Sequence, residues 1–149
     1  MVSSALSWFF WLLSSTPEME EKILKEVEEV KAKQGYEKLR EMQYLHVVLT
    51  ESMRLYPPVA MNTVECIEDD MFLDGNFVGK GWFVSYNTYA MGRLKELWGE
   101  DCDVFRQERW LEDRVFRPKS RYKYAIFHAG PRTCLVKEVA YIHMKSSRA

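Results

Sequence analysis

The stretch Phe127-His-Ala-Gly-Pro-Arg-Thr-Cys134 determines how the rest of the chain is interpreted. It joins an aromatic segment to a predicted helix, which runs from Leu135 to about Ser146. Gly130-Pro131 favours a turn, and Arg132 places a cation beside Cys134. A cysteine beside a cation at a helix N-terminus favours the thiolate, so Cys134 is a candidate nucleophile, redox sensor or metal ligand. The ordinary alternative is a buried structural cysteine.

The composition limits the classes of protein to which the chain can belong. Its 149 residues are 47% hydrophobic and 29% charged, which argues against disorder and predicts one domain over residues 1–149. The net charge is −1, and no block of Lys or Arg indicates a nucleic-acid or anionic-membrane partner. Cys66, Cys102 and Cys134 show no C-x-x-C spacing, which disfavours a structural zinc site and a disulfide framework and favours a reducing compartment.

The first segment of the chain leaves two interpretations open. Ala5 to Leu13 is an apolar run of signal-peptide length, but no Lys or Arg precedes it and no clear cleavage site follows it. The run is too short to cross a bilayer as a helix. The alternative to a signal peptide is a buried helix whose beginning has been cut away.

Two longer helices are predicted next. Thr16-Pro17 favours a helix start, and an apolar stripe carries this helix to about Lys33, where Gly35 ends it. The second predicted helix runs from Tyr36 to Leu55 and stops before Pro57-Pro58, because a proline disfavours helical geometry at the residue that precedes it. The stripe of the first helix consists of Met19, Ile23, Val27 and Val30.

From residue 59 to residue 124 the sequence pattern changes from helical periodicity to short strands, turns and irregular segments. Asp74-Gly75 is a hairpin signal between two short apolar runs, and Trp82 to Tyr86 is predicted to be a further strand. Residues 87–124 mix scattered aromatic side chains with many charges and lack a regular period. They are too aromatic for a linker, so we expect an ordered meander with short helical turns. The whole pattern predicts a mainly α fold with a small β-region.

One charged pair lies in the second predicted helix. Glu51 and Arg54 are spaced so that they share a helix face. The ordinary interpretation of such a pair is an exposed ion pair that contributes little to stability. The rest of this helix has many apolar positions, and the helix ends in Leu55-Tyr-Pro-Pro58.

Phe127-x-x-Gly130-x-Arg132-x-Cys134 resembles the Phe-x-x-Gly-x-Arg-x-Cys-x-Gly haem-binding signature of the cytochrome P-450 family. The resemblance implies that Cys134 is the axial thiolate ligand of a haem iron. It also implies that Arg132 pairs with a haem propionate and that Gly130 allows a tight bend beside the porphyrin.

The same resemblance implies cofactor-binding positions for Phe127 and His128. His128 would face either a propionate or a solvent or backbone partner. The chain departs from the signature at Val136, where the family has Gly. A valine adds a branched side chain at the point where the last helix lies against the haem, which would weaken haem binding or shift the ring.

Glu51-x-x-Arg54 with the Leu-Tyr-Pro-Pro that follows resembles the same family's Glu-x-x-Arg helix. In that family a second Arg from the meander completes the buried group. The matching residue is Arg109, in Phe105-Arg-Gln-Glu-Arg-Trp110, where the family usually has Pro at the place of Gln107. The resemblance implies a structural role for Glu51, Arg54 and Arg109 and no part in the chemistry.

Finer resemblance points to plant fatty-acid ω-hydroxylases. It implies a haem-binding monooxygenase that inserts one oxygen atom from O2 into a C–H bond of an acyl chain, with electrons from NADPH through a reductase. It also implies that full-length members of the family are located at the cytosolic face of the endoplasmic reticulum membrane. Val59, Ala60 and Met61 correspond to a wall of the substrate channel, although local packing explains them equally well. The segments concerned are Tyr89-Ala-Met-Gly-Arg93, Leu97-Trp-Gly-Glu-Asp-Cys102 and Tyr124-Ala-Ile-Phe-His-Ala-Gly-Pro-Arg132.

Ser4 to Leu13 resembles the second half of the family's long central helix, which favours the helix over the signal peptide. The family's oxygen-activating acid and Thr belong near Met1 and Val2, and its membrane anchor and distal haem wall are absent from this chain. We therefore expect the C-terminal part of the family's fold, with little or no monooxygenase activity by itself. A non-catalytic haem-binding or interaction fragment is the alternative function, and a small secreted module is a third.

Overall fold

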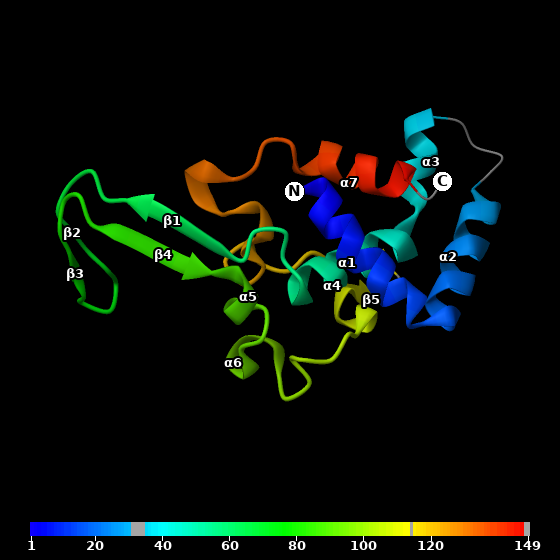
Figure 1. Ribbon diagram of the computed structural model, residues 1–149, viewed down its shortest axis with the longest axis horizontal. Coiled ribbons are helices and arrows are strands. Elements are labelled where there is room, and N and C mark those ends of the chain that lie inside the picture. Colours follow the sequence, from blue (N-terminus) through cyan, green and yellow to red (C-terminus); the bar gives the residue numbers. More distant parts are fainter. Residues whose placement is uncertain (31–34, 114, 148–149) are drawn as a thin grey trace.

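A computed structural model describes residues 1–30, 35–113 and 115–147 of the protein. Most helices gather at one end of the molecule, and a long β-ribbon extends from the other (Figure 1). The expected mainly α fold with a small β-region is confirmed. Within the described ranges, no helix is long and apolar enough to cross a membrane.

Helix α1 (Val2–Ser14) buries one face of the apolar N-terminal run. This face packs against α4 (Gln43–Leu55), which confirms the interpretation as a buried helix for one side of α1. The opposite side is less covered: Trp8 is 40% and Trp11 53% exposed, although the Trp8 ring stacks on Tyr56 at 4.3 Å between ring centres. The buried side chains of α1 are Ala5, Phe9 and Leu13.

Helix α2 (Pro17–Glu29) begins where it was predicted, with Thr16 at the N-cap position. All four residues of the predicted apolar stripe are buried. The predicted end of this helix is wrong, because Val30 leaves helical geometry (φ −97°, ψ 1°) and packs into the core. Lys33, where the end was predicted, lies outside the described residues. Gly35 begins the next helix and does not end this one.

The single helix predicted over residues 36–55 is two helices in the structure. These are α3 (Gly35–Glu41) and α4, and the prediction of one continuous helix is therefore wrong. The chain breaks at Met42, whose φ of −69° and ψ of 79° are not helical and whose side chain is fully buried. The predicted end at Leu55, before the two prolines, is confirmed.

The start of α4 is marked by a side chain from another helix. The carboxylate of Glu26 in α2 accepts hydrogen bonds from the backbone N–H groups of Tyr44 at 2.7 Å and Leu45 at 2.8 Å. A helix start leaves such N–H groups without partners and favours negative charge, so Glu26 stabilises a new helix at this point. Burial raises the pKa of Glu26, and the backbone hydrogen bonds oppose that rise.

The ribbon consists of two antiparallel strand pairs. β1 (Met61–Glu65) pairs with β4 (Phe83–Asn87), and at the tip β2 (Asp70–Met71) pairs with β3 (Phe77–Val78). The hairpin predicted from Asp74-Gly75 is confirmed, since Gly75 adopts a φ of 84° in the turn. The strand predicted from Trp82 to Tyr86 is also confirmed as β4, which begins and ends one residue later than predicted.

Short elements follow the ribbon, as predicted for the meander. One further strand pair, β5 with β6, was not predicted because each strand is only two residues long. The last helix begins at Lys137 and not at Leu135, because Leu135 and Val136 form a turn. The elements are α5 (Thr88–Met91), α6 (Lys95–Trp98), η1 (Gln107–Trp110), β5 (Leu111–Glu112), β6 (Val115–Phe116), η2 (Ala125–Phe127), η3 (Gly130–Arg132) and α7 (Lys137–Ser146).

Two groups of buried side chains form the core. The larger group joins α1, α2, α4 and α7 and includes Phe127 from the loop before α7. The smaller group lies between α4 and the meander, around Trp98 and Trp110. Because α4 contributes to both groups, it is the central support that connects the Cys134 loop with the meander.

Candidate functional site

The loop from Phe127 to Cys134 is closed by its own hydrogen bonds. The N–H of Cys134 donates to the carbonyl of Phe127 at 2.8 Å. Thr133 donates to the carbonyl of Gly130 from its N–H at 3.1 Å and from its hydroxyl at 2.8 Å. Gly130 has a φ of 65°, in the left-handed region that favours glycine, so the predicted tight bend requires this residue type. The buried Phe127 side chain anchors the loop in the larger core.

Cys134 is a free, half-buried cysteine at the end of this loop. Its predicted position directly before a helix is wrong, because the turn at Leu135 and Val136 separates it from α7. Leu135 is 98% and Val136 58% exposed, so the loop continues into an uncovered apolar surface. The side chain that replaces the glycine of the haem signature is thus largely uncovered by the described part of the chain.

His128 and Arg132 carry the polar groups of the same loop. Arg132 is exposed and His128 half-buried. His128 has a φ of 60° and a ψ of 173°, a region occupied almost only by glycine, which costs about 1–3 kcal/mol. Its Nδ1 atom lies 2.5 Å from the hydroxyl oxygen of Tyr86 in β4, within a hydrogen bond. A strained residue whose side chain is held in this way is a candidate for a functional contact.

An open cavity of about 770 Å³ lies between the ribbon and this loop. Along the ribbon the half-buried residues Asn62 and Tyr86 lie opposite each other, whereas Met61 and Thr63 are exposed, as expected for alternate strand faces. The sequence analysis missed Tyr86, because its place in a strand gives no sign of its partner in the distant loop. The cavity is lined by Asn62, Thr63, Val64, Glu65, Tyr86, His128, Ala129, Pro131 and Arg132.

The Glu51 carboxylate is fully buried and accepts four hydrogen bonds. Arg54 donates two of them, from Nε and Nη2, each at 2.8 Å. The backbone N–H of Arg106 donates at 2.9 Å and the indole N–H of Trp110 at 2.8 Å. Nε of Arg109 lies 3.5 Å from the same carboxylate, so the three residues of the Glu-x-x-Arg resemblance lie together. A buried carboxylate is stable only when its oxygens are satisfied in this way.

The Arg54 guanidinium joins α4 to the meander. It donates to the backbone carbonyls of Gly92 at 2.5 Å, Cys102 at 2.6 Å and Val104 at 3.1 Å. The chain passes so close at Gly92 that a Cβ there would lie 2.3 Å from the carbonyl oxygen of Arg54. Sequence reasoning missed Gly92 and also the indole donor at Trp110, since only the three-dimensional packing places them at Glu51 and Arg54.

Arg109 fixes the outer part of the same network. It donates to the carbonyl of Trp98 at 2.8 Å and to the carbonyl of Asp101, and it also pairs with the Asp101 carboxylate at 2.8 Å. Hydrogen bonds from Arg106 and Arg109 lower the pKa of Asp101 to about 2. These contacts hold the meander in one conformation beneath α4.

Val59, Ala60 and Met61 connect α4 to β1. Val59 is 38% and Met61 59% exposed, and the carbonyl of Ala60 accepts a hydrogen bond from the Thr88 hydroxyl at 3.0 Å. Val59 also lines a small apolar recess of about 20 Å³ together with Met1, Val2 and Phe127. The structure therefore brings this predicted substrate segment to the start of α1 and to the base of the Cys134 loop.

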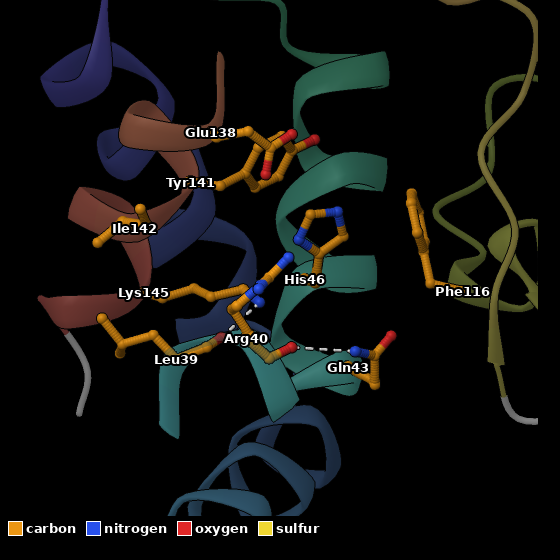
Figure 2. Close-up of a pocket in the computed structure, with 9 residues that line it drawn as sticks. All are labelled: Leu39, Arg40, Gln43, His46, Phe116, Glu138, Tyr141, Ile142 and Lys145. Atoms are coloured by element: carbon orange, nitrogen blue, oxygen red, sulfur yellow. Dashed lines mark hydrogen bonds between the residues drawn. The ribbon is translucent and has the colours of Figure 1, made fainter. Parts of the chain in front are cut away.

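A second hollow, of about 130 Å³, lies between α3, α4 and α7 (Figure 2). His46 stacks on Tyr141 there at 4.1 Å between ring centres, and burial lowers the pKa of His46 to about 3. Nζ of Lys145 donates to the carbonyl of Leu39 at 2.8 Å, and burial lowers the pKa of Lys145 to about 8. His46 is thus a largely buried histidine in a packed environment, and its role is to pack in the core.

The sequence model of the cytochrome P450 family matches residues 2–147. The chain belongs to the cytochrome P450 family. It is 49% identical to cytochrome P450 CYP94D108 of Paris polyphylla, over 99% of this chain and 31% of that protein. It is 49% identical to cytochrome P450 94A1 of Vicia sativa, over 96% of this chain and 29% of that protein. It is 45% identical to cytochrome P450 86B1 of Arabidopsis thaliana, over 99% of this chain and 29% of that protein. The chain spans less than a third of the length of these relatives.

The cytochrome P450 family implies haem as the cofactor, with electrons from NADPH through a reductase. The residues of this P450 chain fit haem. Cys134 offers a free thiol at the end of a closed loop. The cavity of about 770 Å³ is lined by the earlier part of that loop, from His128 to Arg132, and not by Cys134 itself. Arg132 and His128 line the cavity with nitrogen atoms of the kind that bind carboxylates.

Proposed function

We propose that this chain supplies the thiolate side of a haem site in a monooxygenase that hydroxylates the terminal carbon of a fatty-acid chain. The observation that carries the proposal is the closed loop from Phe127 to Cys134, packed onto the helix that holds the buried Glu51–Arg54 pair. When bound through a thiolate, haem iron supplies the chemistry that activates O2 for insertion of one oxygen atom into a C–H bond.

The residues of the loop have separate tasks in this proposal. The Cys134 sulfur would hold the iron, Arg132 would pair with a haem propionate, and His128 would donate a hydrogen bond in the same region. Gly130 allows the bend, and Phe127 anchors it in the core. Glu51, Arg54 and Arg109 hold α4 and the meander beneath the loop and take no part in the chemistry.

The acyl substrate is proposed from the resemblance to plant fatty-acid ω-hydroxylases. Val59 supports it, because this residue borders the apolar recess between the start of α1 and Phe127. Ala60 and Met61 continue the same segment into β1. We further propose that the full-length relatives receive electrons from an NADPH-dependent reductase at the cytosolic face of the endoplasmic reticulum membrane.

The second candidate is a haem-binding or interaction fragment without monooxygenase activity. Val136, in place of the signature glycine, favours it, because the branched side chain stands where the haem would approach α7. We expect little or no hydroxylation by this chain alone.

The test is titration of haem into the purified chain and into three variants. The native chain and Cys66→Ser, a control at another half-buried cysteine, should bind one haem with a thiolate-type spectrum. Cys134→Ser should lose that spectrum, and Val136→Gly should bind haem more tightly. Absence of haem uptake by both the native chain and Val136→Gly would contradict the proposal. Turnover of a fatty acid in the presence of a reductase separates the enzyme from the non-catalytic fragment.

A further inference from the structure

Tyr86 and His128 form a contact that the haem signature does not account for. The Tyr86 hydroxyl lies 2.5 Å from Nδ1 of His128, and the rings meet edge to face with their centres 6.3 Å apart. This is the one hydrogen bond of the Tyr86 hydroxyl among the described residues. In the tautomer whose Nδ1 carries no proton, the Tyr86 hydroxyl donates to Nδ1 and the neutral imidazole carries its own proton on Nε2.

The backbone of His128 points to the same contact independently. Its φ of 60° and ψ of 173° suit glycine, yet the chain has a histidine there. A glycine would adopt this conformation without strain. A strained residue is a candidate for a functional contact, and in the described structure the His128 side chain contacts Tyr86.

His128 is one of the residues that line the cavity beside the loop. Tyr86, His128 and Arg132 all line this cavity of about 770 Å³. Tyr86 is fixed in place because β4 pairs with β1, where Asn62 lies opposite it. With Nδ1 occupied, the Nε2–H group of His128 and the guanidinium of Arg132 present N–H donors, and no acceptor, to a bound carboxylate.

We propose that Tyr86 is a positioning residue that holds His128 in its Nε2–H tautomer, so that His128 and Arg132 together bind a haem propionate. The inference rests on the proposed function, since the carboxylate belongs to the haem. Tyr86 lines the same cavity as His128 and Arg132. It acts through His128, and its effect on haem binding should vanish when the imidazole is absent.

The experiment combines two readouts on the whole chain. Nitrogen-15 NMR of the histidine side chains reports the His128 tautomer before haem is added. Haem titration then gives the dissociation constants of the native chain, Tyr86→Phe, His128→Gly and the double variant. Tyr122→Phe is the matched control, because this tyrosine is 75% exposed and does not line the cavity. Circular dichroism checks that each variant is folded.

The native chain should show an unprotonated, hydrogen-bonded Nδ1, and Tyr86→Phe should lose this signature. Tyr86→Phe should weaken haem binding about 2–13-fold, the range expected for one neutral hydrogen bond, and Tyr122→Phe should not. In the His128→Gly background, Tyr86→Phe should have no further effect. A native His128 protonated at Nδ1, or an equal effect of Tyr86→Phe with and without the imidazole, would overturn the inference. If the native chain takes up no haem, the proposed function and the propionate contact fail, while the NMR result still decides whether Tyr86 sets the tautomer.

Discussion

Replacement of Glu51 by Gln should destabilise the fold by about 3–5 kcal/mol, the range for breaking a fully buried ion pair. The carboxylate receives four hydrogen bonds, two of them from Arg54, which is itself fully buried. An amide replaces one acceptor oxygen by an NH2 group that faces N–H donors, and it leaves the charge of Arg54 without a counter-charge. Since a domain is stable by about 5–15 kcal/mol, this loss is a large part of the total.

The assay is urea unfolding followed by tryptophan fluorescence, with Glu112→Gln as the matched control. Glu112 pairs with Arg117 at 3.1 Å, but their side chains are 70% and 60% exposed, so its loss should cost about 0–1 kcal/mol. At about 1 M salt the small effect of Glu112→Gln should disappear because exposed charges are screened, whereas that of Glu51→Gln should persist. Equal losses for the two variants would refute the reasoning that the buried network supports the fold.

Three further changes test other parts of the structure. Gly92→Ala should destabilise the protein by about 1–3 kcal/mol, because the new Cβ would lie 2.3 Å from the carbonyl oxygen of Arg54; an unchanged urea midpoint would contradict the close approach. Burial lowers the pKa of His46 to about 3, so the unfolded chain binds the proton more readily and the free energy of unfolding should fall as pH drops from about 6.5 toward 3. His46→Phe should reduce this fall, measured by unfolding at several pH values, and the exposed His143→Gln should not. Phe9→Ala should cost about 3–5 kcal/mol because Phe9 is 1% exposed, and Phe83→Ala, at a site 72% exposed, should cost far less in the same assay.

Local sequence patterns correctly predicted the helix boundaries and the turn that are determined by a few neighbouring residues. Thr16-Pro17 gave the correct start of α2, and the prolines after Tyr56 gave the correct end of α4. Asp74-Gly75 gave the hairpin, because a left-handed turn residue is needed there whatever surrounds it. The motif at residues 127–134 also led to the family, and its cysteine and glycine lie on one closed loop.

The errors arose where a distant part of the chain determines local structure. The break at Met42 depends on a carboxylate from α2, which no pattern within residues 36–55 reveals. Tyr86 looked like an ordinary strand residue, because its partner His128 is far away in sequence. Gly92 is required by the backbone of Arg54, again a contact between segments. These are tertiary effects that override local propensity.

The proposed function depends on binding of haem iron by the Cys134 sulfur. The most direct measurement is the absorption spectrum of the reduced, carbon-monoxide-bound complex of the haem-loaded chain, compared with the same spectra of Cys134→Ser and Cys66→Ser. We expect the red-shifted Soret band of a thiolate ligand in the native chain and in Cys66→Ser, and its loss in Cys134→Ser. A thiolate band that survives in Cys134→Ser, or a native complex that never shows one, would contradict this expectation.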